Sequence, residues 1–258
     1  MPELPDVEVF RRFFDAHALG QAIRSVEVRN VKILEHTTPE KLERALVSHS
    51  FTETRRHGKH LFAHLDQGPW LALHFGMTGF LRYYASERGI DHTRMLIAFR
   101  NGNSLAYDDS RMFGRITLTD SVENYIRAKE LGPDALAVSQ ETFRELIAGR
   151  KTPLKIALMD QRTIAGLGNI YADEVLFQAR LHPLRNTRSL SETDLENLYR
   201  SVRQVLDRAV KSHADPDEMP DSFLIPHRRA GAPCPLCGGV VKKVTIAGRS
   251  AYYCDCQK

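Results

Sequence analysis

Apolar side chains recur at helical spacing near the start of the chain and again throughout its second half. The first run opens at Pro5 and stops before Gly20, residues that suit the first turn and the end of a helix, so we expect a helix over residues 5–19. The same spacing predicts helices over 141–149, 153–162, 170–179 and 192–212. The last of these is the clearest, because Ser191 and Asp194 would form a capping box ahead of it.

Short β-branched or aromatic runs, separated by Gly, Asn and Asp, fill residues 22–119. We expect strands within 23–34, 60–65, 70–75, 95–99 and 116–118. Many short strands at this density are typical of an antiparallel sandwich or barrel. After Leu131-Gly132-Pro133 the pattern becomes helical, so the sequence predicts a β-rich first part and an α-helical second part.

The composition excludes several classes of protein. The chain has 258 residues, of which 42% are hydrophobic, enough to fill ordinary cores, so global disorder is excluded. Its apolar runs are far shorter than the roughly 18 to 20 residues of a membrane span, and its first residues mix Phe with charged side chains, unlike a signal peptide. We therefore expect a soluble, cytoplasmic protein. The net charge of +4 permits a nucleic-acid partner without indicating one.

All four cysteines lie close together near the C-terminal end, whereas disulfides that staple a whole fold would be spread along it. Their spacing approaches the two pairs of a zinc ribbon, which predicts one structural zinc ion bound by Cys234, Cys237, Cys254 and Cys256. A reduced, metal-free tail is the alternative. The second pair has one residue between its cysteines where two are usual, a tighter chelate that would strain the site or weaken metal binding.

Two features could contact phosphate groups. Lys242, Lys243 and Arg249 make the hairpin between the cysteine pairs basic, although a merely solvated basic face is the alternative. Between two predicted helices, the turn 165–169 carries two glycines, and its backbone amides would open onto the N-terminus of the next helix, a ready site for an anion. Such glycines also occur in plain turns. Nearby Lys155 and the basic hairpin favour the phosphate interpretation.

The N-terminal residues are unusual in their chemistry. Removal of Met1 would leave Pro2 with a secondary α-amine, whose pKa near 8 keeps a useful fraction neutral and nucleophilic. Glu3 would then stand beside that amine as a proton donor. The alternative is an ordinary helix N-terminus, where acidic residues interact favourably with the helix dipole.

Three segments of the β-rich part carry candidate functional residues on loops or turns. Lys59 follows a basic segment and opens a strand, Met77 stands on a glycine-flanked loop, and Arg111 and Phe113 share another loop. Side chains of these types commonly replace unstacked bases in complexes with DNA. Taken singly, Met77 and Phe113 also suit a protein core.

In this order and spacing, the strings resemble the formamidopyrimidine-DNA glycosylase and endonuclease VIII family of bifunctional DNA repair enzymes. The likeness runs from Pro2 to Lys258 and is carried by PELPDVE, the GK at Lys59, HFGMTG, DDSRMFG, LMDQRTIAGLGNIYADE and YYCDCQK. Any one string is weak, but the ordered set is highly specific. Leu4 favours the formamidopyrimidine branch, because the endonuclease VIII branch usually has Gly there.

The resemblance implies a multidomain α+β fold that agrees with the pattern of elements. It implies an N-terminal antiparallel β-sandwich with a flanking helix over 1–131, a helix-two-turn-helix domain over 132–226 and a zinc ribbon over 227–258. Double-stranded DNA with damaged bases or abasic sites would lie in the cleft between the halves. The protein would be a monomer of the bacterial type, in the cytoplasm and associated with the nucleoid through DNA binding.

The resemblance also implies a role for each matching residue. Pro2 would be the nucleophile of a glycosylase and abasic-site lyase that works through a Schiff base and β,δ-elimination, and Glu3 would protonate the sugar. Phosphates around the lesion would be held by Lys59, Asn169 and Arg249, while Met77, Arg111 and Phe113 would fill the gap left by the flipped nucleotide, with Lys155 near the lesion pocket.

Three departures from the family pattern concern substrate choice more than reaction type. Asp6 stands where Glu is usual, and the segment 214–226 is shorter than the family segment that includes the loop capping 8-oxoguanine. Residues 227–231, His-Arg-Arg-Ala-Gly, replace a more usual Tyr-Gly-Arg pattern. Two other functions stay open: a non-catalytic DNA-binding homologue, which would not need a free Pro2, and an N-terminal-proline tautomerase, which would have no use for the basic ribbon.

Overall fold

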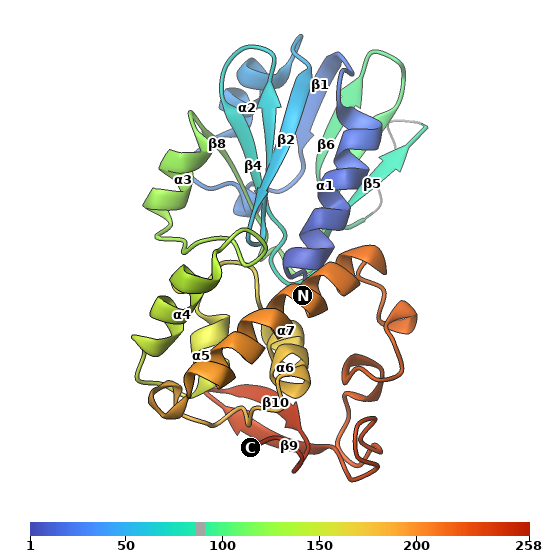
Figure 1. Ribbon diagram of the computed structural model, residues 1–258. Coiled ribbons are helices and arrows are strands. Elements are labelled where there is room, and N and C mark those ends of the chain that lie inside the picture. Colours follow the sequence, from blue (N-terminus) through green and yellow to red (C-terminus); the bar gives the residue numbers. More distant parts are fainter. Residues whose placement is uncertain (86–90) are drawn as a thin grey trace. The chain divides into compact units, whose positions relative to one another are not determined.

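The computed structural model of the protein describes residues 1–85 and 91–258 (Figure 1). Contacts divide the chain into two compact units, of which the first holds residues 1–2 and 6–129 and the second holds 3–5 and 130–258. Helix α1, Leu4–Ala18, begins one residue earlier than predicted. Its first two residues therefore belong to the second unit, and its remainder belongs to the first.

The first unit is an antiparallel β-sandwich, as predicted. Its strands are β1 Ile23–Val28, β2 Phe51–His57, β3 His60–Leu65, β4 Trp70–His74, β5 Gly79–Tyr84, β6 Thr93–Phe99, β7 Ser104–Asp109 and β8 Arg115–Thr119. Within the described residues they form two four-stranded sheets, in the orders β1-β6-β7-β5 and β2-β3-β4-β8. Helix α1 packs on them through Val7, Phe14 and Ala18, all fully buried.

Three short helices in this unit were not predicted. They are the 3-10 helix η1 Val31–Ile33, α2 Pro39–Leu46 and α3 Val122–Ala128. The strand expected over 23–34 therefore ends at Val28, because the Asn30 side chain accepts a hydrogen bond from the Lys32 amide and starts η1. The sequence does carry the signals for α2, since Thr38 caps its N-terminus and Pro39 occupies its first turn.

The second unit is helical, and its helices lie close to the predicted ranges. They are α4 Gln140–Ala148, α5 Leu154–Met159, α6 Asn169–Gln178 and α7 Glu192–Lys211. The capping box of Ser191 and Asp194 is present at the start of α7. Helix α5 stops three residues short of its predicted end, because the Asp160 carboxylate accepts hydrogen bonds from the amide of Arg162 and the hydroxyl of Thr163 and starts a turn.

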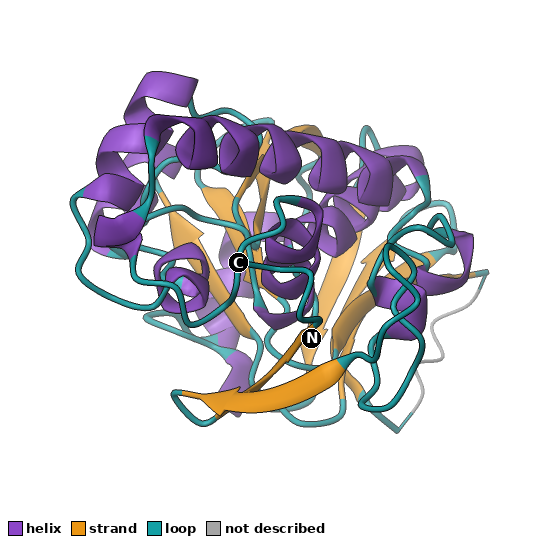
Figure 2. Ribbon diagram, turned by 60° about the horizontal axis from the view of Figure 1, so that its bottom comes forward, coloured by secondary structure: helices purple, strands orange, loops and turns teal. Residues whose placement is uncertain are grey.

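The 3-10 helix η2, Thr187–Ser189, precedes α7. Two further 3-10 helices follow α7, η3 Pro216–Glu218 and η4 Ile225–His227. A two-stranded antiparallel hairpin follows, with β9 Lys242–Ile246 and β10 Arg249–Tyr253. Helices are purple and strands are orange in Figure 2. Among residues 1–85 and 91–258, no helix combines the length and the apolar character needed to cross a membrane.

Candidate functional site

The carboxylate of Glu3 lies at the N-terminus of helix α6. Its two oxygens accept hydrogen bonds from the backbone amides of Gly168 at 2.6 Å, Ile170 at 2.8 Å and Tyr171 at 3.2 Å. Glu3 is only 1% exposed, and the half-buried Pro2 precedes it directly in the chain. These amides have no acceptor within their own helix, so a carboxylate there is stabilised by hydrogen bonds and by the helix dipole.

Two glycines make room for this arrangement. A Cβ atom on Gly168 would lie 2.4 Å from Cδ of Glu3, and one on Gly166 would lie 2.5 Å from Cδ1 of Leu4. Gly166 also has a φ of +126°, which side chains other than glycine rarely adopt. The glycines of this turn are therefore required by the close approach of Glu3 and Leu4.

This finding corrects the phosphate interpretation of the turn 165–169. The amides that were expected to open toward a phosphate donate instead to the Glu3 carboxylate, which occupies the anion site itself. Asn169 is the first residue of α6, and its role as a phosphate contact stays a prediction. No pattern within the turn itself could have identified Glu3 as the group that fills it.

In the first unit, the carboxylate of Asp109 joins the two loops that carry Met77, Arg111 and Phe113. It accepts hydrogen bonds from the Thr78 hydroxyl at 2.6 Å, the Gly114 amide at 2.8 Å and the Arg111 amide at 3.2 Å. Asp109 is fully buried. A single buried carboxylate therefore fixes both loops, and sequence reasoning did not single it out, although it belongs to the string DDSRMFG.

Neither Met77 nor Phe113 belongs to the core. Met77 is 37% exposed and Phe113 is 50% exposed, so the alternative of core residues is wrong. The guanidinium of Arg111 lies over the Phe113 ring, 5.0 Å from its centroid. A large exposed apolar side chain on a fixed loop is suited to contact a base, because stacking on an aromatic ring stabilises an unpaired base.

Lys59 lies in the two-residue turn of the hairpin that joins β2 to β3, between the paired residues His57 and His60. Gly58 precedes it with a φ of +54°, as such turns require. Burial, and after it the nearby positive charge of Lys59, lower the pKa of His74 to about 4. Burial likewise holds the pKa of His60 well below its usual range. The β-sheet next to Lys59 thus contains two neutral histidines at neutral pH.

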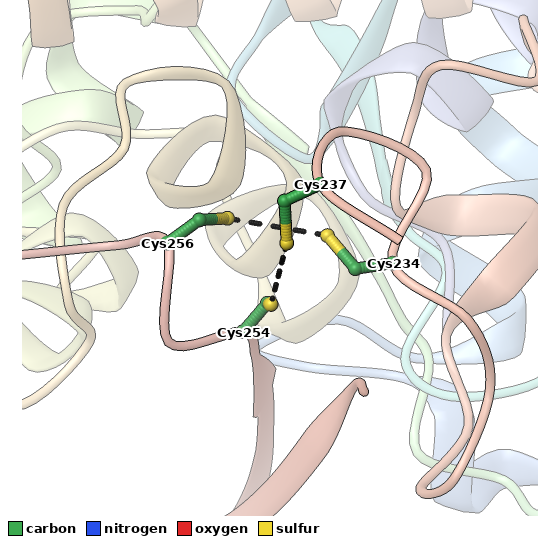
Figure 3. A group of neighbouring side chains, drawn as sticks. All are labelled: Cys234, Cys237, Cys254 and Cys256. Carbon is green, nitrogen blue, oxygen red and sulfur yellow. Dashed lines mark hydrogen bonds between the residues drawn. The ribbon is translucent and has the colours of Figure 1, made fainter. Parts of the chain in front are cut away.

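The four cysteines form a cluster in the second unit (Figure 3). Their Sγ atoms all lie within 4.8 Å of one another, with Cys234 and Cys256 3.9 Å apart and Cys237 and Cys254 3.5 Å apart. Thiolates bound at about 2.3 Å to a tetrahedral zinc ion would be about 3.8 Å apart. The four residues therefore fit one zinc ion, and the shortened pair Cys254-Asp255-Cys256 brings both its thiols into the cluster.

Lys155 and Arg249 lie on the same side of the second unit, where both line a cavity of about 180 Å³ with Ile156, Met159, Asp160, Ile246 and Ala247. Arg249 is exposed at the start of β10. Lys155 is 1% exposed, and its Nζ atom donates to Asp173 Oδ1 at 2.6 Å and to the Ser250 carbonyl at 2.8 Å. The ammonium of Lys155 is therefore hydrogen-bonded to protein groups. Its place near the lesion pocket stays a prediction.

Sequence reasoning missed the acidic residues of α6. Asp173 and Glu174 are both buried in this helix, and burial raises the pKa of Glu174 to about 7. Two adjacent charges in a stretch that is otherwise largely apolar were the available signal. The Glu174 carboxylate accepts hydrogen bonds from the amides of Leu224 at 3.1 Å and Ile225 at 2.7 Å, so it anchors the segment that follows α7.

Comparison with known proteins gives matches over nearly the whole chain. Residues 1–116 match the N-terminal domain of formamidopyrimidine-DNA glycosylase, residues 131–218 match its H2TH domain, and residues 231–258 match a zinc finger found in FPG and IleRS. The chain is 34% identical to the formamidopyrimidine-DNA glycosylase of Desulforamulus reducens and 38% identical to that of Thermus thermophilus. These alignments cover the whole chain and 99% and 98% of the relatives.

Solved structures give the same result. The complex of Lactococcus lactis Fpg with abasic-site DNA has a TM-score of 0.90 to this chain, with 30% identity and full coverage of both chains. A complex of the same Lactococcus lactis protein with DNA containing N7-benzyl-Fapy-dG has a TM-score of 0.91, again with 30% identity and full coverage.

Proposed function

The chain belongs to the formamidopyrimidine-DNA glycosylase family, and we propose that it removes oxidised bases from double-stranded DNA and then cleaves the strand at the abasic site. It is a DNA glycosylase of base excision repair, and the second step is a lyase reaction by β,δ-elimination. Complexes of a similar protein with abasic-site DNA and with a Fapy-dG lesion support this class of substrate.

The chemistry begins at Pro2, once Met1 has been removed. The secondary amine attacks the anomeric carbon, the bond from that carbon to the base breaks, and the base leaves with the electron pair. The Glu3 carboxylate takes up the N–H proton that the amine loses and passes it to the ring oxygen as the sugar opens, while the departing base takes a proton from water. The nitrogen and the anomeric carbon thereby become an iminium ion. A secondary amine leaves no N–H proton on that ion, so it stays positively charged and accepts the electrons of elimination. Loss of the C2′ proton then releases the 3′ phosphate, and a second elimination releases the 5′ phosphate.

The observation that carries this proposal is the fixed carboxylate of Glu3. Three backbone amides hold it at the start of α6, and the peptide bond holds it next to Pro2. An acid that must protonate one particular oxygen gains from such a fixed position, because the reacting groups need not be ordered during the reaction.

Binding of DNA would use residues from both units. Lys59, Asn169 and Arg249 would contact phosphates, and Met77, Arg111 and Phe113 would fill the space of the flipped nucleotide. The ribbon holds one structural zinc ion. In this proposal the chain works as a monomer with domains 1–131, 132–226 and 227–258, in a bacterial-type cytoplasm and close to the nucleoid.

Trapping with borohydride tests the proposal. Borohydride should reduce the iminium to a stable link between the protein and a duplex with an abasic site. Pro2→Gly should trap much less, and a form that retains Met1 should not trap at all. Mass spectrometry of the trapped protein should place the link on the N-terminal residue. Equal trapping by the wild type and by the form that retains Met1 would place the nucleophile elsewhere.

A further inference from the structure

A buried charge cluster joins helix α6 to the ribbon hairpin in the second unit. Its centre is Asp173, whose side chain is fully buried. Lys155 Nζ donates to Asp173 Oδ1 at 2.6 Å, and the guanidinium of Arg228 donates to Oδ2 at 3.0 Å from Nε and at 2.7 Å from a terminal nitrogen. The backbone amide of Tyr252 donates to the same Oδ2 at 3.2 Å. One carboxylate thus connects α5, α6, the segment after α7 and strand β10.

Arg228 also contacts elements on both sides of this carboxylate. Its terminal nitrogen donates to the backbone carbonyl of Asn169 at 3.3 Å, at the first residue of α6. Its guanidinium carbon lies 4.7 Å from the centroid of the Tyr252 ring in β10. Only 17% of its side chain is exposed. Arg228 belongs to the segment 227–231, where the sequence departs from the usual family pattern.

These contacts reach the backbone at one residue of this unit that is proposed to contact a phosphate, Asn169, and next to the other, Arg249. Arg228 holds the carbonyl of Asn169, and Lys155 holds the carbonyl of Ser250, the residue that directly follows Arg249. The cluster therefore restrains the backbone at Asn169 and next to Arg249, and Arg249 itself is exposed.

We infer that Arg228 is a positioning residue, which couples the start of α6 to the ribbon so that Asn169 and Arg249 contact the DNA backbone as one unit. This inference rests on the proposed function. The arginine suits the role because its planar guanidinium donates several hydrogen bonds in a fixed geometry, which a lysine ammonium cannot copy. Burial makes the bonds to Asp173 stronger than they would be in water.

Direct contact of Arg228 with a phosphate is the competing explanation, and a double-variant cycle with Arg249 separates the two. In both cases the slope of log Kd against log salt concentration falls by about 0.9, because one phosphate contact of a cationic side chain is lost. A direct contact would remove one contact, and its effect would add to that of Arg249. A positioning role would weaken the contacts of both Asn169 and Arg249, and its effect would overlap with theirs.

The experiment measures Kd for a duplex with a tetrahydrofuran abasic-site analogue, which the enzyme cannot cleave, over a range of KCl concentrations. We compare the wild type with Arg228→Gln, Arg228→Lys and Arg229→Gln. Arg229 is exposed and next in the chain, so Arg229→Gln removes the same charge without touching the cluster. In Arg228→Gln, Lys155 still pairs with Asp173, and zinc content and melting temperature show whether the fold is kept.

We expect Arg228→Gln to weaken binding about tenfold or more and to lower the salt slope by about 0.9, the value for one cationic contact, because Arg249 is charged and Asn169 is not. Arg228→Lys should keep the charge and recover only part of the affinity. The double variant Arg228→Gln with Arg249→Gln should lose less binding free energy than the sum of the two single losses. Additive effects of Arg228→Gln and Arg249→Gln, or the same affinity for Arg228→Gln and Arg229→Gln, would overturn the inference. Failure of the wild type to bind and to be trapped would instead overturn the proposed function.

Discussion

The carboxylate of Glu3 accepts a 2.6 Å hydrogen bond from the backbone amide of Gly168, although 165 positions separate the two residues in the chain. The position of one residue accounts for the type of the other. Glu3 is held in place by the amides at the start of α6, and Gly168 has no side chain because Glu3 occupies the space where a Cβ would lie. The strings PELPDVE and AGLGN lie far apart in the sequence, but Glu3 and Leu4 of the first contact Gly168 and Gly166 of the second.

Replacing Glu3 with Gln should abolish base excision and leave more of the lyase reaction. The amide has no acidic proton to donate, and only the first reaction needs the sugar to be protonated. Gln also offers one acceptor oxygen where the carboxylate offers two, so an NH₂ group would face a backbone amide and cost about 1–3 kcal/mol of stability. Single-turnover rates on a lesion duplex and on a preformed abasic duplex would measure both steps. Equal loss of the two would contradict the role of Glu3 as the acid.

Gly168→Ala tests the same relationship from the other side. The new Cβ would lie 2.4 Å from Cδ of Glu3, so the carboxylate must move. We expect base excision to fall strongly while the ribbon keeps its zinc. Gly149→Ala is the matched control, because that Cβ would meet only the Glu145 carbonyl oxygen at 3.2 Å, at the end of α4. If both variants excise bases at the wild-type rate, the position of the Glu3 carboxylate does not limit the reaction.

Much of the fold could be predicted from the sequence, because its signals are local. The helix ranges of the second unit follow from apolar spacing and from one capping box, and the sandwich follows from short β-branched runs. The zinc site also follows from local spacing, since the four cysteines fold into one cluster. Helix α2 was missed because its eight residues hold too few turns for apolar spacing to stand out among the strands.

The carboxylates that organise the site could not be predicted in the same way. Glu3, Asp109 and Asp173 all act on groups distant in sequence or on backbone amides, and no spacing rule describes such contacts. The turn 165–169 shows the limit most clearly. Its sequence correctly indicates an anion site at a helix N-terminus, but the anion is the side chain of Glu3, from the start of the chain.

Asp109→Asn should loosen the loops that carry Met77 and Phe113. Asn keeps one acceptor oxygen, while Asp109 accepts from Thr78, Arg111 and Gly114. A buried amide left without its acceptor costs about 1–3 kcal/mol, so the melting temperature of the protein should fall. Affinity for an abasic-site duplex should fall more than affinity for an undamaged duplex, because only the damaged site uses both loops. The exposed Asp120 supplies the control, Asp120→Asn.

The stability of the first unit should fall as the pH drops from about 6.5 to 4. His74 has its pKa lowered to about 4 in the folded protein, mainly by burial, so between these values it is protonated only in the unfolded chain. The unfolded state then binds more protons, and acid favours it, by up to about 3 kcal/mol for a shift of this size. The protein has one tryptophan, Trp70 in β4, whose fluorescence would report urea unfolding of this unit at each pH.

His74→Gln should make that pH dependence shallower, because Gln does not titrate. His60 has its pKa lowered in the same direction, so part of the dependence should remain. His213→Gln is the control, since that side chain is 74% exposed. A pH dependence that is identical in the wild type and His74→Gln would show that His74 is not the group responsible.

The length of the segment 214–226 should determine which lesion the protein prefers. In the structure this segment is packed against the helices: Met219 and Phe223 are each 5% exposed, and the Glu174 carboxylate holds the amides of Leu224 and Ile225. So anchored, it has little chain left to close over a flipped base. An 8-oxoguanine differs from guanine only by an oxo group and an N7 proton, so selecting it needs placed polar groups around the base.

We therefore expect this protein to act faster on abasic sites and on formamidopyrimidine or oxidised-pyrimidine lesions than on 8-oxoguanine opposite cytosine. A ring-opened or oxidised base is non-planar or stacks poorly, and its lower cost of extrusion supplies selectivity without a closed cap. Single-turnover rates on the duplexes, measured at one salt concentration because phosphate contacts make binding salt-dependent, would test the order. If 8-oxoguanine is the fastest substrate, a segment other than 214–226 must close over the base, and the length of this segment does not set the substrate.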